Sequence, residues 1–211
     1  MPMRLLSLLL VFCSATLLAF AFRSEPDPAP PDRTRPGAWT ETQLRAMTLA
    51  QQIGQLFAVR ARGVFQSVDD PDYRELVRLV EQFQVGGVIF FQGDPYSQAM
   101  LANELQRRSR LPLLIAQDTE WGVAMRVSRT TSFPRAMAIG ATGNPDYAYA
   151  VGYITAREAR ALGVHQLYAP VADVNNNPLN PIINVRAFGE DPRLVATMVR
   201  AFVRGVQDAG A

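Results

Sequence analysis

The sequence predicts an α/β fold of the (β/α)8 barrel class. Short apolar segments alternate four times with segments of helical spacing, which is typical of βα units. The apolar segments are continuous runs, as expected for parallel strands that are covered on both faces. A doubly wound sheet fits the same pattern, but no Gly-x-Gly-x-x-Gly follows any strand; the nearest approach, residues 140–143, follows none. Because a barrel needs about 250 residues, we expect about the first half to two-thirds of one.

The individual elements can be placed in chain order. Residues 40–43 have the form of a capping box and predict a helix that continues towards Gln52. Gly163 is expected to end one of the later helices, and Asp191 is expected to be the N-cap of another, whose first residue is Pro192. Periodicity predicts strands at residues 56–59, 88–91, 113–116 and 166–171, and further helices at residues 73–83, 98–108, 147–162 and 192–208.

The first 38 residues are expected to lie outside this fold. Residues 1–21 have a basic start, an apolar middle and a small-x-small ending, which predicts an export signal cut after Ala21. The apolar run is just long enough to span a bilayer, so an uncleaved anchor is the alternative. Residues 22–38 are rich in proline and charge and predict a linker. The globular domain is therefore expected over residues 39–211, in an exported protein, periplasmic or secreted.

Composition excludes several functional classes. Cys13 is the single cysteine and lies in the predicted signal, so the mature chain has no disulfide, thiolate metal site or cysteine nucleophile. The chain contains no lysine, which excludes Schiff-base chemistry and a P-loop. The formal net charge is +2 and the arginines are scattered, which argues against nucleic-acid binding. We expect no cofactor and no metal.

Charged residues gather where the third predicted strand ends. Asp118, Glu120 and Arg126 follow the apolar run 113–116 directly. Sites of parallel α/β folds are built at the carboxyl ends of strands, which makes this segment the leading candidate. A weaker version recurs after the fourth strand, at Asp173 and Arg186.

These segments resemble glycoside hydrolase family 3, and more narrowly its β-N-acetylhexosaminidase branch. The similarity extends from about Leu44 to the end of the chain. The motifs that carry it, in chain order, are DTEWG at 118–122 with Arg126, SFP at 132–134, APVADVN at 169–175 and VRAFGEDP at 185–192. Several motifs in the right order make the resemblance far more specific than any single one.

The resemblance implies that Asp118 holds sugar hydroxyls and that Arg126 and Arg186 match the two sugar-binding arginines of the family. The chemistry agrees, because a carboxylate accepts from two hydroxyls and a guanidinium offers a donor fork. Structural alternatives stay open beside these roles. Arg126 could pair with Asp118 or Glu120.

Arg186 could instead anchor its own loop against Glu190 or Asp191. His165, the single histidine, precedes a predicted strand, so we expect it at the opposite end of the barrel in a structural or solvent-facing role. No Ser-His-Asp arrangement fits that placement.

Three further residues are expected to support the pocket or its loops. Glu120 and Asp118 are two apart and cannot face each other across a substrate as glycosidase carboxylates do, so we favour a loop-orienting role for Glu120. Trp121 is expected either to shape the sugar pocket or to pack on the barrel rim. Asp173 is expected to hold the asparagine-rich loop 175–177 by turn hydrogen bonds.

By resemblance, the full enzyme removes terminal β-linked N-acetylglucosamine with retention, through a glycosyl-aspartate. Peptidoglycan fragments would suit an exported enzyme of this branch. The family places its general acid/base and its nucleophile on later segments, so we expect the catalytic residues beyond Ala211, none in this chain, and an inactive, unstable fragment. A β-glucosidase of the same family is one alternative. The other is an exported, non-catalytic sugar-binding protein.

Overall fold

The computed structural model describes residues 37–211. The predicted signal peptide and most of the predicted linker lie outside the described residues. Residues 43–211 form a compact unit that contains the sheet and every candidate site residue. The first described helix, α1 (Ala38–Ala46), already begins on the last residue of the predicted linker.

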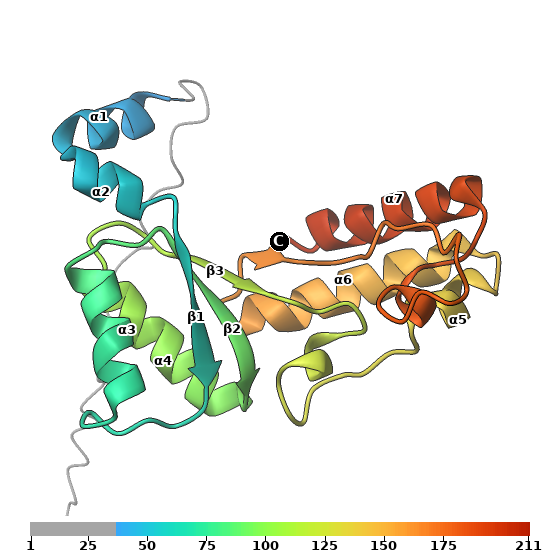
Figure 1. Ribbon diagram of the computed structural model, residues 1–211, viewed down its shortest axis with the longest axis horizontal. Coiled ribbons are helices and arrows are strands. Elements are labelled where there is room, and N and C mark those ends of the chain that lie inside the picture. The colour runs from blue at the N-terminus through green and yellow to red at the C-terminus, as the bar shows by residue number, and fades with distance from the viewer. Residues whose placement is uncertain (1–36) are drawn as a thin grey trace, which may run out of the picture. The chain divides into compact units, whose positions relative to one another are not determined.

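Helices and strands alternate through the compact unit (Figure 1). The elements after α1 are α2 (Leu49–Gly54), β1 (Ala58–Gly63), α3 (Pro71–Glu81), β2 (Gly87–Gly93), α4 (Pro95–Arg108), β3 (Leu114–Gln117), the 3-10 helix η1 (Val123–Met125), α5 (Ala136–Gly140), α6 (Pro145–Ala161), β4 (Gln166–Leu167), the 3-10 helix η2 (Asn184–Arg186) and α7 (Pro192–Asp208). Pro192 starts α7 behind the N-cap Asp191, as predicted.

The four described strands form one parallel sheet in the order β1-β2-β3-β4. One row of paired residues crosses the whole sheet, from Ala61 through Phe90 and Gln117 to Leu167. A doubly wound sheet would reverse its strand order at a switch point. Among residues 37–211 the order follows the sequence without reversal, which is the arrangement of consecutive strands in a barrel.

One face of the sheet is covered by α3 and α4, which lie side by side (Figure 1). Val88, Phe90 and Ile115 point into this layer and are fully buried, together with Leu105 of α4. Successive residues of a strand face opposite ways. Their neighbours, such as Leu114, therefore lie on the second face.

That second face is open within the described residues, which contradicts the expectation that both faces are covered. Leu114 is 47% exposed although it lies in the middle of the apolar run. In a closed barrel this face would be the interior, filled by side chains from strands all around the ring. The four strands described here supply only part of that filling.

A second core lies between α6 and α7, which run side by side (Figure 1). Met198 and Phe202 of α7 are buried there. The two helices approach closely at Gly205, where an added Cβ would lie 2.2 Å from the backbone oxygen of Tyr149. Glycine at this position therefore permits the contact between the helix backbones.

Two predictions at the start of the domain were wrong. Thr40 lies inside α1, and the capping box forms at Thr48, whose hydroxyl accepts from the Gln51 N–H while Gln51 Oε1 accepts from the Thr48 N–H. This reciprocal cap starts a separate helix, so the predicted single helix is two. The first strand begins at Ala58 rather than at Leu56, which is 84% exposed.

The fourth strand is shorter than the predicted 166–171. It is flanked by bonds from the His165 N–H to the Ile115 oxygen, 2.8 Å, and from the Tyr168 N–H to the Gln117 oxygen, 3.0 Å. β3 has only four residues, so regular pairing ends with it.

Among the described helices, none is long and apolar enough to cross a membrane.

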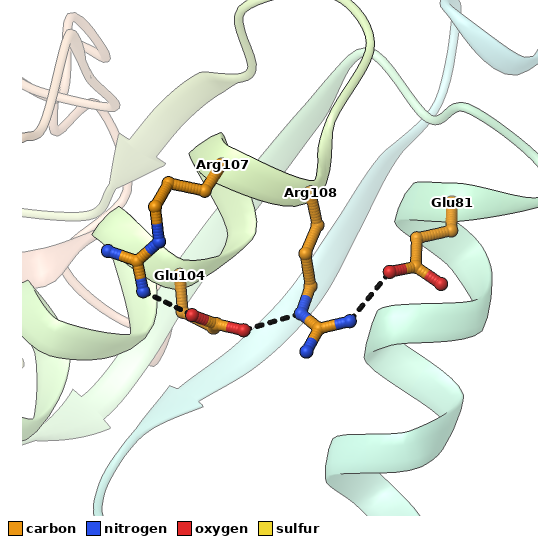
Figure 2. A network of polar contacts seen from close by, with 4 residues as sticks. All are labelled: Glu81, Glu104, Arg107 and Arg108. Atoms are coloured by element: carbon orange, nitrogen blue, oxygen red, sulfur yellow. Dashed lines mark hydrogen bonds and ion pairs between the residues drawn. The ribbon is translucent and has the colours of Figure 1, made fainter.

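The outer surface of α3 and α4 carries a small charge network (Figure 2). Arg108 bridges Glu104 of its own helix and Glu81 of α3, with 2.7 Å between Arg108 Nη1 and Glu81 Oε1, and Arg107 also contacts Glu104. The hydrogen bonds to Glu81 and Glu104 raise the pKa of Arg108. The network is exposed and remote from the sheet's carboxyl edge, so we assign it no role in the site.

Candidate functional site

The site begins at the carboxyl end of β3. Gln117 is buried against α4, where its Nε2 donates to Gln98 Oε1 at 3.0 Å. Strand alternation then places Asp118 on the opposite, open face, in line with Ala116 and Leu114. Asp118 is 26% exposed, so its carboxylate is reachable from solvent.

Arg126 is folded back onto Asp118 by the loop between them. Gly122, with φ of 99°, turns the chain into η1, and the Arg126 N–H closes that turn on the Val123 oxygen. The Gly93 N–H donates to the Arg126 oxygen at 2.9 Å and ties the loop to the end of β2. The guanidinium then pairs with the Asp118 carboxylate.

The aromatic ring of Phe91 lies against the same guanidinium. The Arg126 guanidinium carbon lies 4.9 Å from the ring centroid of Phe91, and that of Arg60 lies 5.6 Å from it. Phe91 lies on β2, on the open face of the sheet, by the same alternation. In the sequence Phe91 is recognisable only as part of a strand, because a phenylalanine within an apolar run carries no signal of a role in a site.

Glu120 and Arg186 form a second ion pair that joins two loops. Arg186 Nε donates to Glu120 Oε2 at 2.9 Å and Nη2 donates to Oε1 at 2.7 Å. Arg186 Nη1 also donates to the Ile182 oxygen. Glu120 therefore ties its own loop to that of Arg186, and Arg186 binds Glu120 rather than Glu190 or Asp191, the alternative partners.

The site concentrates negative charge around Arg186. Its hydrogen bonds to Glu120 raise the pKa of the guanidinium, and the charges of Glu120, Asp173 and Asp118 raise it further. The fold thus brings together five of the six residues singled out from the sequence. The pattern of two arginines among three acids suits a neutral, polyhydroxylated ligand, because donors and acceptors alternate at its rim.

The sixth residue, Trp121, is held by a different contact. The Arg135 guanidinium carbon lies 3.2 Å from the Trp121 ring centroid, and the Phe133 N–H donates to the Trp121 oxygen. The indole is half-buried in this arrangement. Both expected roles, pocket wall and rim packing, remain compatible with this position.

Asp173 does not make the turn hydrogen bonds expected of it. In the asparagine-rich loop those bonds come from other side chains: Asn177 Oδ1 accepts from Leu179 N–H, and Asn180 Oδ1 accepts from two following N–H groups. Asp173 is exposed, and no hydrogen bond of its carboxylate is found among the described residues. Its contribution to the site is its charge near Arg186.

His165 lies at the opposite end of the sheet from the site. Its Nδ1 accepts from the Ile115 N–H at 3.1 Å. Burial, with the charge of Arg160, lowers the pKa of this imidazole. A backbone-bound, neutral histidine at the amino end of β4 agrees with the structural role expected for it.

Neither carboxylate at the end of β3 is free to work with the other. Asp118 pairs with Arg126, and Glu120 pairs with Arg186. Within residues 37–211, no group of three or more metal-binding side chains occurs.

Comparisons with known proteins match most of the described residues. The model of the glycosyl hydrolase family 3 N-terminal domain matches residues 48–211. A β-N-acetylglucosaminidase/β-glucosidase of Cellulomonas fimi is 35% identical over 173 residues, which is 82% of this chain and 29% of the relative.

Solved structures agree on the fold. A family 3 β-N-acetylglucosaminidase from Paenibacillus sp. str. FPU-7 has a TM-score of 0.68 at 36% identity, covering 78% of this chain and 32% of that one. A β-glucoside phosphorylase, BglX, with 2FGlc bound, has a TM-score of 0.75 at 28% identity, covering 82% and 30%. This chain spans about three-tenths of the length of these proteins. The barrel-type fold predicted from the sequence is confirmed.

Proposed function

This chain belongs to glycosyl hydrolase family 3, and we propose that it supplies the sugar-binding half of a retaining glycosidase that removes terminal β-linked N-acetylglucosamine. The observation that carries the proposal is the cluster at the carboxyl edge of the sheet. There Asp118 with Arg126, and Glu120 with Arg186, meet from two loops. Relatives named for N-acetylglucosaminidase activity support the substrate class.

The proposed binding mode follows from the exposure of the pairs. Asp118 and Arg126 keep 26% and 18% of their side-chain surface accessible, so a sugar can reach both without breaking their contact. Asp118 accepts from ring hydroxyls, and the arginines donate to the same or neighbouring oxygens. Glu120 is only 11% exposed and holds Arg186 in place.

The chemical step is proposed to use other residues than these. A retaining glycosidase needs a nucleophile and an acid about 5–5.5 Å apart across the sugar. Asp118 and Glu120 are each engaged by an arginine, and the chain spans about three-tenths of its relatives. We therefore assign residues 37–211 to substrate binding, and expect residues 1–211 alone to give no turnover.

The proposed compartment and natural substrate rest on the N-terminal sequence. Residues 1–21 have the composition of an export signal, with an uncleaved anchor as the alternative. An exported N-acetylglucosaminidase would meet peptidoglycan fragments, which carry this sugar. Detection of the protein in the cytoplasmic fraction, with residues 1–21 retained, would contradict this part of the proposal.

A β-glucoside is the second candidate substrate. The Cellulomonas fimi relative is named for both activities, and the BglX structure is of a β-glucoside phosphorylase. The two sugars differ at one position, where N-acetylglucosamine carries an acetamido group and glucose a hydroxyl. The hydroxyls that Asp118 would bind are common to both, so the described pairs by themselves do not choose between them.

A titration of the product of the intact gene with N-acetylglucosamine, and in parallel with glucose, tests the proposal. We expect N-acetylglucosamine to bind more tightly, and Asp118→Ala to weaken it at least about tenfold, the loss of a charge-assisted hydrogen bond. Glu75→Ala is the control, since Glu75 pairs with Arg78 on the surface of α3. Equal binding by Asp118→Ala and the unmodified chain would overturn the proposed site.

A non-catalytic sugar-binding protein is the alternative of another class. Turnover separates the two, measured with the nitrophenyl N-acetylglucosaminide and the nitrophenyl glucoside on the product of the intact gene. Hydrolysis supports the enzyme, and the preferred glycoside identifies the substrate. Binding without any hydrolysis would favour the non-catalytic alternative.

A further inference from the structure

A carboxylate on α6 holds the loop that carries Arg126. Glu158 is half-buried on α6, and its Oε2 accepts from the Thr131 N–H at 3.2 Å. The Thr131 hydroxyl donates to Glu158 Oε1. A single side chain thus binds both donors of one loop residue.

Thr131 in turn contacts the outgoing limb of the same loop, which is the part that leads from β3 to Arg126. Its backbone oxygen accepts from the Ala124 N–H at 3.2 Å. The same oxygen lies so near Gly122 that an added Cβ there would be 2.4 Å from it. The two limbs of the loop therefore touch through the backbone of Thr131, and no side chain larger than that of glycine fits at residue 122 without a shift.

The outgoing limb leads directly to Arg126. Ala124 lies in the 3-10 helix η1, and the Arg126 N–H donates to the Val123 oxygen at 2.9 Å within that turn. The position of η1 determines where the Arg126 side chain starts. From there the guanidinium reaches Asp118 and the ring of Phe91.

Glu158 does not form an ion pair within its own helix, as charged residues on a helix surface usually do. Glu75 on α3, for example, pairs with Arg78 of its own helix at i,i+3. The arginines beside Glu158 bind other groups: Arg157 Nη1 contacts Tyr153 Oη and Arg160 Nη1 contacts the Val164 oxygen, each at 3.3 Å. Glu158 instead binds a loop residue 27 positions away.

We propose that Glu158 is a positioning residue for sugar binding: through Thr131 it holds η1, and thereby Arg126, in the place from which the guanidinium meets the sugar beside Asp118. The inference rests on the proposed function for its consequence in binding. Its structural part, the coupling of Glu158 to the guanidinium of Arg126, can be measured without any sugar.

Two matched pairs of variants separate positioning from stability. Glu158→Ala removes both hydrogen bonds, and Thr131→Val removes the one from the hydroxyl while the backbone N–H of residue 131 is kept. Glu158→Gln can still accept the Thr131 N–H and donate to its hydroxyl, and Thr131→Ser keeps the hydroxyl. Glu75→Ala is the control for the loss of a carboxylate, because it removes a glutamate that pairs with Arg78 on the surface of α3.

The first measurement is the Nε–Hε NMR signal of Arg126, with that of Arg186 as internal reference. In Glu158→Ala and Thr131→Val we expect the Arg126 signal to move towards that of a free arginine, while Arg186 keeps its position. The second measurement is the dissociation constant for N-acetylglucosamine, expected to rise about tenfold, a change of 1.4 kcal/mol. Glu158→Gln and Thr131→Ser are expected to stay within about threefold of the unmodified chain, which is less than 1 kcal/mol.

An unmoved Arg126 signal in Glu158→Ala, in which both hydrogen bonds to Thr131 are lost, would overturn the proposal, even if the variant is less stable. Restored unfolding temperature without a restored signal in Thr131→Ser would do the same. If the unmodified chain binds no sugar, the proposed function fails, but the NMR signals still decide whether Glu158 positions Arg126. Should Glu158→Ala not fold, the Thr131 pair carries the test alone.

Discussion

Glu120 and Arg186 are 66 residues apart in sequence and form a bidentate ion pair, with Nε–Oε2 of 2.9 Å and Nη2–Oε1 of 2.7 Å. The pair joins the loop after β3 to the loop after β4. Of the two acids in the short segment after β3, only one is therefore available to bind a ligand. Glu120 holds a distant arginine, which leaves Asp118 available beside Arg126.

Arg186→Lys tests whether the fork of this pair matters for binding. A lysine ammonium lacks the planar fork with which Arg186 binds both oxygens of Glu120 in parallel. We expect about tenfold weaker binding of N-acetylglucosamine, measured by calorimetry, and little change in unfolding temperature. Arg78→Lys is the matched control, because Arg78 forms a bidentate pair with Glu75 far from the site. Unchanged affinity in Arg186→Lys would remove Arg186 from the site.

Gly122→Ala is expected to displace the loop that carries Arg126. The substitution places a Cβ 2.4 Å from the Thr131 oxygen, in a residue whose φ is 99°. Gly143→Ala is the control, since Gly143 also has a positive φ, 65°, but nothing lies within 4 Å of its added Cβ. Backbone strain alone costs about 1–3 kcal/mol, so both variants lose stability. Weaker sugar binding is expected in Gly122→Ala only, and loss of affinity in both would point to strain rather than displacement.

The contact between α6 and α7 predicts a stability effect without an effect on the site. Gly205→Ala forces the helices apart, because the new Cβ would meet the Tyr149 oxygen at 2.2 Å. We expect about 1–3 kcal/mol of lost stability, the usual range for overpacking, in urea unfolding. Gly189→Ala meets only Leu194 Cδ2, at 3.4 Å, and is expected to be nearly neutral. Equal unfolding midpoints for the two variants would show that the helices can adjust.

The single histidine predicts a pH dependence of stability. Burial lowers the pKa of His165 in the folded state, while the pKa of a histidine in the unfolded state is about 6.5. As the pH falls through that value, the unfolded state takes up the proton first, so the free energy of unfolding decreases. Protonation of Nδ1 would also break its bond with the Ile115 N–H.

His165→Asn is the variant that isolates this effect, because the amide oxygen can replace Nδ1 as acceptor and does not titrate. Urea unfolding midpoints between pH 7.5 and 5.5 should fall in the unmodified chain and change less in the variant. Parallel curves for the two proteins would show that His165 does not cause the decrease.

Local sequence signals predicted the helices well, because each depends on few neighbouring residues. Asp191 with Pro192, and Gly163 with its φ of 77°, punctuate helices where the sequence indicated. The capping box was assigned to the wrong threonine, since both Thr40 and Thr48 have a suitable residue three positions later. Only the reciprocal hydrogen bonds distinguish the two.

The extent of the strands depended on partners that the sequence does not reveal. The run 166–171 is apolar enough for a strand, but β3 pairs with only two of its residues. The open face of the sheet was likewise not predicted. Continuous apolar runs indicate burial on both faces, whereas Leu114 is 47% exposed among the described residues.

The sequence by itself determined the fold class, the family and the residues gathered at the strand ends, because strand-helix alternation and motif order are properties of the chain alone. Tertiary structure decided which acid binds which arginine: Glu120, rather than Glu190 or Asp191, binds Arg186. It also revealed Glu158, which lies on a helix with no motif of its own. Contacts between residues 27 or 66 positions apart depend on how the sheet and helices pack, and no local pattern records that distance.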